Sequence, residues 1–189
     1  NKLNLHFIDG KFTEGLPFVS KLLVEIENYK TKIDAHHIMV FYYKIACMYF
    51  GAGKNEECIV YLEKIINNKD LTMREDLMCF SRVLNLVAHY DAGIDFNIEK
   101  LIVSTYKFLI KMNDLHEVQQ KMIVFLKNLS NIYPQDLRKE FIKLHSELIK
   151  FENHPHEKRA FLYLDILSWL ESKIQNSTVE KIIQQKAKK

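Results

Sequence analysis

A match of the chain to itself, at a constant offset of 43 residues, constrains its fold more than any other feature. Residues 6–16 align with residues 49–59, and Gly10 falls on Gly53. Self-similarity at a fixed period of this length is the signature of stacked repeats, in which each unit buries its apolar face against its neighbours. The chain is therefore expected to fold as a series of similar units.

The second copy, residues 34–68, has the pattern of two amphipathic helices joined by a turn. Its apolar residues recur at steps of three and four, the period of one face of an α-helix. Gly53 lies where the pattern stops, and glycine takes the positive-φ conformations that end helices. Because short helices are marginal in water, the antiparallel pair is the smallest unit expected to be stable. The apolar positions are Ile38, Phe41, Tyr42, Ile45, Ala46 and Tyr49, then Cys58, Ile59, Leu62, Ile65 and Ile66.

This second copy resembles a tetratricopeptide repeat, although any antiparallel helical hairpin would share part of the pattern. The resemblance implies an all-α fold, an α-α superhelix (solenoid) of about eight or nine helices in antiparallel pairs. Helix starts near residues 34, 73, 114 and 155 give a period of about 40, longer than the family's 34, which predicts longer helices or looser joints. The family's slots hold Tyr42, Ile45, Ala46, Tyr49, Gly53, Cys58, Leu62 and Ile65, with Asp70 near the place of the frequent closing proline.

A single repeat domain is expected over residues 1–175, followed by a polar tail, residues 176–189. The repeat alignment places residues 3–7 at the end of a first helix whose beginning is missing, so the chain is expected to be truncated inside a repeat of a longer protein. The tail has apolar residues for one weak helix. Further helices are expected over 12–31, 72–92 and 98–112, from 113–114, from Pro134, and from 153–155 to about 173.

The net charge and the cysteines indicate which partners and which cellular compartment to expect. The net charge is +3 and no basic stripe appears along the repeats, so no nucleic-acid partner is expected. Cys47, Cys58 and Cys79 lie at apolar helix positions, an odd and sparse set that favours reduced thiols and a cytoplasmic protein. No apolar run reaches the roughly 18–20 residues that span a bilayer, so no membrane association is expected.

Two short motifs have a catalytic or ligand-binding interpretation, and neither is complete. The segment 51–54 lacks the earlier glycine and the following Ser or Thr of a phosphate loop, since Asn55 follows Lys54. His116 is followed by Gln120 where a zinc-protease helix needs its second histidine. No nucleophile or dinucleotide motif is present either. The sequence therefore predicts a non-catalytic protein without a metal or cofactor, with an enzyme as the less favoured class.

The resemblance also implies a concave groove lined by the first helix of each pair. Tyr43 and Cys47 stand where family members that clamp carboxylates have lysine, asparagine or arginine, so that ligand class is not expected. A groove of aromatic and aliphatic residues would instead take an amphipathic helix or an apolar peptide. Burial of several of these side chains in the core is the competing interpretation. The candidate groove residues are Val40, Tyr43, Cys47, Phe50, Ser81, Leu84, Ala88, Asp91, Ile123 and Lys127.

The sequence thus favours a protein- or peptide-binding scaffold. One alternative is a peptide-sensing or regulatory module of a transcription regulator with an upstream DNA-binding domain. A homodimer through the helix containing Trp169 is a further expectation, because that helix is apolar on more than one side. Either the tail folds back on it or a second subunit covers it. Residues 157–173 also resemble the end of bacterial repeat proteins of unassigned activity, which adds no function.

Overall fold

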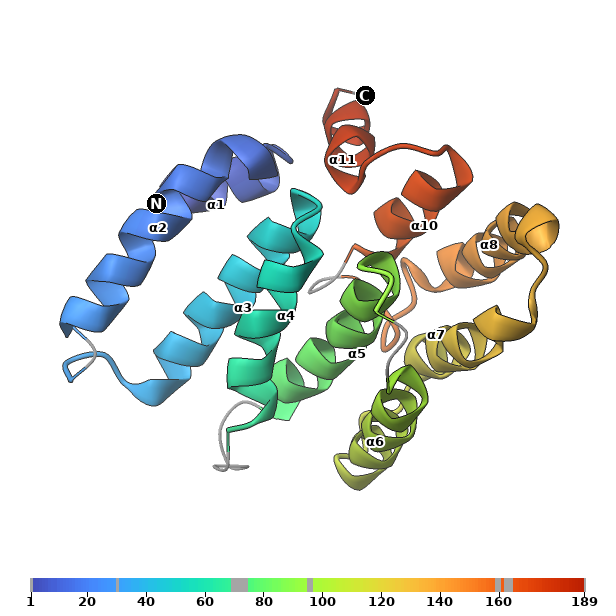
Figure 1. Cartoon of the computed structure of the whole chain (residues 1–189), viewed down its shortest axis with the longest axis horizontal. Helices are drawn as coiled ribbons and strands as arrows, with labels where there is room; N and C mark the ends of the chain where they lie inside the picture. Colours follow the sequence, from blue (N-terminus) through green and yellow to red (C-terminus); the bar gives the residue numbers. More distant parts are fainter. Residues whose placement is uncertain are drawn as a thin grey trace.

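The computed structural model describes residues 2–29, 31–68, 75–94, 97–158, 161 and 165–188, and this part of the chain is helical without any strand (Figure 1). The prediction of an all-helical fold is confirmed. None of the described helices has the length and apolar character needed to cross a membrane. The α-helices are α1 Lys2–Ile8, α2 Phe12–Tyr29, α3 Ala35–Gly51, α4 Asn55–Ile66, α5 Glu75–Asp91, α6 Ile98–Lys111, α7 Glu117–Asn128, α8 Pro134–Leu148, α10 Ile166–Ile174 and α11 Val179–Ala187.

The helix pair predicted over residues 34–68 is formed by α3 and α4, although Asn55 is the first residue of α4 rather than its cap. Asp34 caps α3, since its carboxylate accepts a hydrogen bond from the His37 backbone N–H over 3.1 Å. At the turn Gly53 has a φ of +72°, and the aligned Gly10 has +63° between α1 and α2. The two turns that align in the sequence therefore share their backbone conformation.

Helix α5 is the centre of the fold. Its side chains are buried on nearly every side, because α4 and α6 pack against it as sequence neighbours while α3 and α7 contact it from further away. The main apolar core extends from α3 through α5 to α10 and α11, and a smaller cluster lies between α2 and α3. Each fully buried aliphatic side chain contributes about 1.5–3 kcal/mol before conformational entropy is subtracted.

Two predicted helix starts are wrong. Helix α7 starts at Glu117 rather than at 113–114, because Asn113 takes a φ of +52° that ends α6. The long helix predicted from 153–155 does not start there, since residues 152–153 and 155–158 form turns. Residues 159–160 and 162–164 of the same prediction lie outside the described part of the chain. Helix α10 starts at Ile166, where the Asp165 carboxylate accepts a hydrogen bond from the Ser168 N–H over 2.8 Å. A proline at 155 disfavours helix in the residue before it, and a capping aspartate sets the later start.

The expected tail forms α11, which folds back on α10 and reaches the turn between α1 and α2 (Figure 1). Trp169 on α10 is 0% exposed within the single chain. It makes edge-to-face contacts with Tyr90 of α5 and Phe141 of α8. The second apolar side of the Trp169 helix is thus covered by the same chain, and this corrects the reason given above for a homodimer through it.

Candidate functional site

The ten residues predicted to line a groove do not form one open surface. Val40 is half-buried and Lys127 is exposed, but most of the others lie in the core. A ligand would reach those side chains only after a covering helix had moved. The buried residues are Tyr43, Cys47, Phe50, Ser81, Leu84, Ala88 and Ile123.

Asp91, the remaining predicted groove residue, is bound by the chain itself. Its Oδ2 accepts a hydrogen bond from Trp169 Nε1 over 3.1 Å. Lys173 Nζ lies 2.7 Å from Oδ1, as an ion pair rather than an aligned hydrogen bond. Both partners come from α10, so the polar position expected to meet a ligand instead holds α10.

A polar cavity of about 620 Å³ contains a cysteine next to an acidic residue and a histidine. Burial, and then the nearby Asp114 carboxylate, raise the pKa of the Cys79 thiol far above its ordinary value. His116 Nε2 lies 3.4 Å from Asp114 Oδ1. Because the thiolate is the nucleophilic form of cysteine, this environment disfavours thiol chemistry. The cavity is lined by Glu75, Asp76, Cys79, Met112, Asn113, Asp114 and His116.

The other two cysteines are also buried thiols, as predicted. Burial raises the pKa of Cys47 to about 12, and it raises the pKa of Cys58 well above its ordinary value. Among the described residues, no group of three histidine, cysteine or acidic side chains is placed to hold a metal ion.

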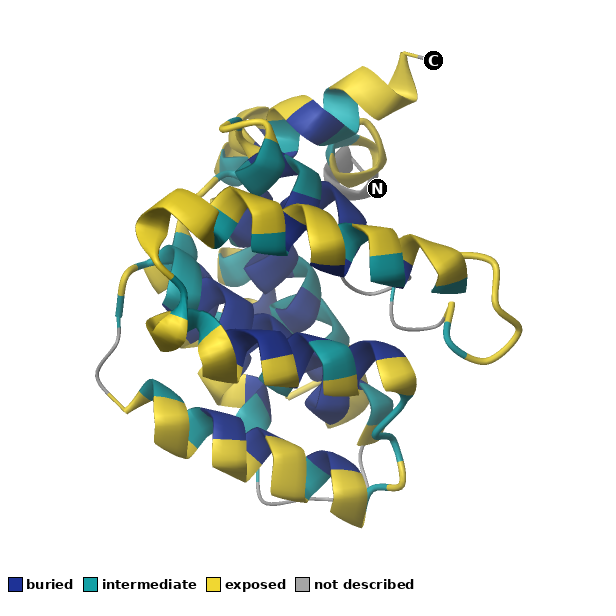
Figure 2. Cartoon of the chain, turned by 90° about the vertical axis from the view of Figure 1, so that its right-hand side faces the viewer, coloured by how far each residue is buried: buried dark blue, intermediate teal, exposed yellow. Residues whose placement is uncertain are grey.

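An open groove of about 630 Å³ lies between α7 and α8. The two helices are consecutive, and each contributes one face at steps of three and four residues, so the groove runs along both. Figure 2 views the molecule from this side. The lining residues are Glu117, Gln120, Lys121, Val124, Phe125 and Asn128 from α7, Ile132 from the connection, and Glu140, Lys143, Leu144 and Glu147 from α8.

The groove has an apolar floor and a charged rim. Val124 contributes an exposed apolar side chain to the groove, with 51% of its surface accessible. Phe125 and Leu144, which also line the groove, are buried. On the rim, Lys121 Nζ donates a hydrogen bond to Glu147 Oε2 over 3.0 Å and thereby joins the two walls. This hydrogen bond lowers the pKa of the Glu147 carboxyl. The arrangement presents apolar surface between charged side chains of both signs.

Local sequence features explain how the two walls are held. Pro134 occupies the start of α8, where its fixed φ suits a helix and its missing N–H costs little. At the start of α7, the Glu157 carboxylate accepts hydrogen bonds of 3.1 Å from the N–H groups of Glu117 and Val118. A carboxylate is stabilised there by the positive end of the helix dipole. The segment between α8 and α10 therefore fixes one end of the groove.

The sequence did not predict this groove, although two of the predicted groove residues, Ile123 and Lys127, lie on the same helix α7. Ile123 is buried on another face of the helix. The available signal was Val124, an apolar residue outside the buried stripe of its own helix. One exposed valine is too common on protein surfaces to indicate a groove until the second wall is known.

Comparison of the chain with protein-family models, curated proteins and solved structures gave no match. The assignment of a site therefore rests on the geometry of the chain itself.

Proposed function

We propose that this chain is a non-catalytic, protein-binding scaffold and that it holds an amphipathic helix of a partner protein in the α7–α8 groove. The observation that carries the proposal is the groove itself, with its apolar floor and its rim of charged side chains. Grooves between helices commonly bind the apolar stripe of another helix, which is read through anchors at steps of three and four residues.

The dimensions of the groove suit such a ligand. The face of α7 from Glu117 to Asn128 spans about 16 Å, at about 1.5 Å per residue, which matches three turns of a bound helix. A helix that uses all three turns displaces the contact between Lys121 and Glu147. Apolar anchors would pack between Val124 and Leu144. Glu140 and Lys143 offer charges of both signs at the rim, so the partner is expected to carry complementary charges beside its apolar stripe.

The tetratricopeptide-like solenoid is part of the same proposal. Its support comes from the turns that follow α1, α3 and α5. Gly10, Gly53 and Gly93 occupy these turns with φ values of +63°, +72° and +67°. A shared turn conformation at similar intervals is what repeated helical hairpins require.

A peptide selection tests the proposed function. Displayed helical peptides would be selected on the wild-type chain, and those that bind would be measured on the Val124→Asp and Val103→Asp variants. Both valines are 51% exposed, but Val103 lies on α6 and does not line the groove. A charge at Val124 should weaken binding at least tenfold, while a charge at Val103 should leave it within twofold. Equal affinities for the two variants, or no selected binder, would overturn the proposal.

A further inference from the structure

Apart from the α7–α8 groove, the molecule has a surface on which a helix is already bound, namely its own α11. This surface, which we call the α11 seat, consists of the α1–α2 turn and the adjoining side of α10. At the turn, Thr13 donates two hydrogen bonds to the Glu180 carboxylate, from its N–H over 2.9 Å and from its hydroxyl over 2.7 Å. The Gly10 carbonyl accepts a hydrogen bond from Gln184 Nε2 over 3.0 Å.

The polar contacts use a helix terminus that would otherwise lack partners. Thr13 is the second residue of α2, and the first N–H groups of a helix have no acceptor within the helix. The Glu180 carboxylate supplies an acceptor and a negative charge at the positive end of the α2 dipole. The seat therefore selects for a carboxylate at one position of the bound helix.

Apolar contacts between α11 and the seat further restrict which helix can bind. Val179 and Ile182 are the buried side chains of α11 itself. At the turn Ile183 packs so closely that a β-carbon on Gly10 would lie 2.6 Å from its Cγ2. Apolar residues at steps of three and four, with a carboxylate after the first, describe the helix that fits.

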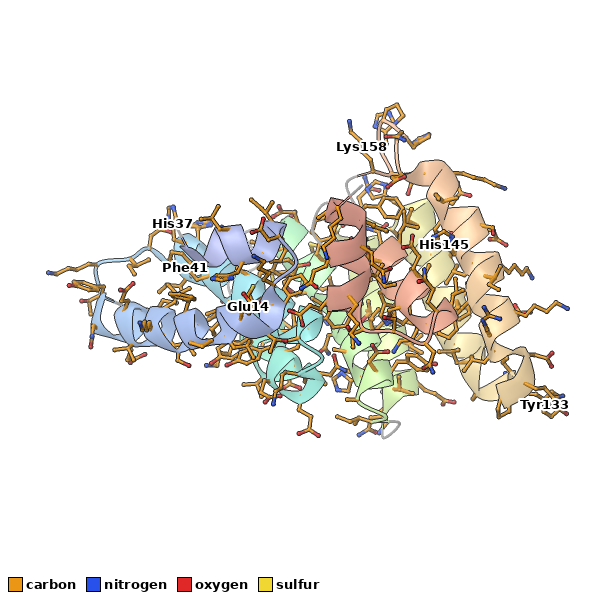
Figure 3. All side chains as sticks on the ribbon, turned by 90° about the horizontal axis from the view of Figure 1, so that it is seen from above. Glu14, His37, Phe41, Tyr133, His145 and Lys158 are labelled. Atoms are coloured by element: carbon orange, nitrogen blue, oxygen red, sulfur yellow. The ribbon has the colours of Figure 1, made fainter. Side chains whose placement is uncertain are left out.

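The other end of α11 is held by α10. Lys186 Nζ donates a hydrogen bond to Ser168 Oγ over 2.9 Å and lies 3.0 Å from Glu171 Oε1. The same Glu171 oxygen lies 3.1 Å from Nε2 of His145, which belongs to α8 (Figure 3). Three helices thus meet around one carboxylate, and this fixes the direction in which a helix lies in the seat.

Helix α11 is a separable element. It has nine residues, and a helix of this length is marginal in water without tertiary contacts. It follows α10 after a short connection in which Asn176 has a φ of +50°. A short helix with only two buried side chains opens at lower free energy than the core.

We propose that the α11 seat is a binding site for an amphipathic helix of another protein that carries the α11 pattern, and that α11 blocks this site until it is displaced. The ligand is an amphipathic helix with a glutamate or aspartate placed to cap α2 and a lysine placed to reach Glu171. The site is distinct from the α7–α8 groove. Because α11 is attached to the chain, a free helix competes with an effective concentration in the millimolar range.

Fluorescence anisotropy on the full chain tests this proposal. The probe is a labelled peptide with the sequence of residues 176–188. A Glu180→Gln substitution in the chain weakens its own α11 but leaves the seat intact, and it should raise the affinity for the probe at least fivefold over wild type. The matched Lys181→Ala variant changes an exposed residue on the same helix and should bind as wild type does.

A substitution in the peptide tests whether the seat prefers a carboxylate at the position of Glu180. A probe with glutamine in place of Glu180 should bind the Glu180→Gln chain at least fivefold more weakly than the original probe. Equal affinity of the two probes, or of the Glu180→Gln and wild-type chains, would overturn the proposal. Val124→Asp should leave probe binding unchanged, so failure here and failure of the α7–α8 groove are distinguishable.

Discussion

Trp169 donates the hydrogen bond of its indole N–H to the carboxylate of Asp91, a residue 78 positions earlier in the chain. The contact joins the start of the C-terminal helix pair to the end of the central helix α5. Together with the ring contacts to Tyr90 and Phe141, it covers the Trp169 side of α10 with the same chain. Helix α10 thereby packs against α8 and α5, and α11 packs against α10.

Asp91→Ala should destabilise the chain by about 1–3 kcal/mol, because the buried indole N–H would lose its acceptor. Asp91→Asn keeps an acceptor oxygen and should cost less. Urea unfolding followed by the fluorescence of Trp169, the single tryptophan, measures both. An Asp91→Ala variant as stable as wild type would show that the hydrogen bond does not hold α10 in place.

Gly10→Ala should destabilise the chain more than Gly53→Ala. Both positions have positive φ, so each substitution carries a backbone penalty of about 1–2 kcal/mol. At Gly10 the new β-carbon would collide with the side chain of Ile183. At Gly53 no atom lies within 4 Å of the place that the new β-carbon would take. Thermal unfolding of the two variants gives the comparison, and equal losses would argue against tight packing of α11 on the turn.

Glu157→Ala should loosen the start of α7, since the carboxylate accepts from two backbone N–H groups there. Loss of a helix cap typically costs about 1 kcal/mol. Hydrogen exchange should accelerate at the amides of Glu117 and Val118 and remain unchanged in α3. The exposed Glu152 in the same segment provides the control, because Glu152→Ala should leave these amides as in wild type.

Stability should fall in alkaline solution because of the buried thiols. The pKa of Cys47 is raised to about 12, so above the ordinary thiol pKa the unfolded chain releases a proton that the native chain keeps. The stabilisation that the protonated Cys47 thiol gives the native chain is therefore complete below about pH 9, and it is lost progressively as the pH rises toward 12. Its slope is about 1.4 kcal/mol per pH unit.

Cys47→Ala isolates this effect. In urea unfolding between pH 8 and pH 11 under reducing conditions, the variant should lose stability less steeply than wild type. Parallel pH profiles for the two proteins would mean that the Cys47 thiol is accessible to solvent in the native chain.

The α3–α4 hairpin was predictable from sequence because its information is local. The apolar period, the capping Asp34 and the positive-φ Gly53 all act within a few residues of one another. Helix α2 was equally predictable, since its apolar residues recur at steps of three and four on both sides of Pro17, which lies inside the helix. These elements need no knowledge of which distant segment covers them.

The candidate site was not predictable to the same extent because it depends on distant contacts. Tyr43 and Leu84 lie on apolar helix faces that would suit either a groove or a core, and only the packing of the whole chain decides between them. The helix cap that Glu157 forms on α7 is a contact between segments 39 and 40 residues apart. Periodicity within one helix contains no information about such a partner.

The most direct test of the central claim is an NMR titration of the methyl-labelled chain with a peptide selected on it. Binding in the α7–α8 groove should shift the methyl signals of Val124, Ile132 and Leu144, which line it, and leave Val60 and Val103 in place. Shifts confined to other faces of the molecule, or no shift at saturating peptide, would contradict the assignment of this groove as the binding site.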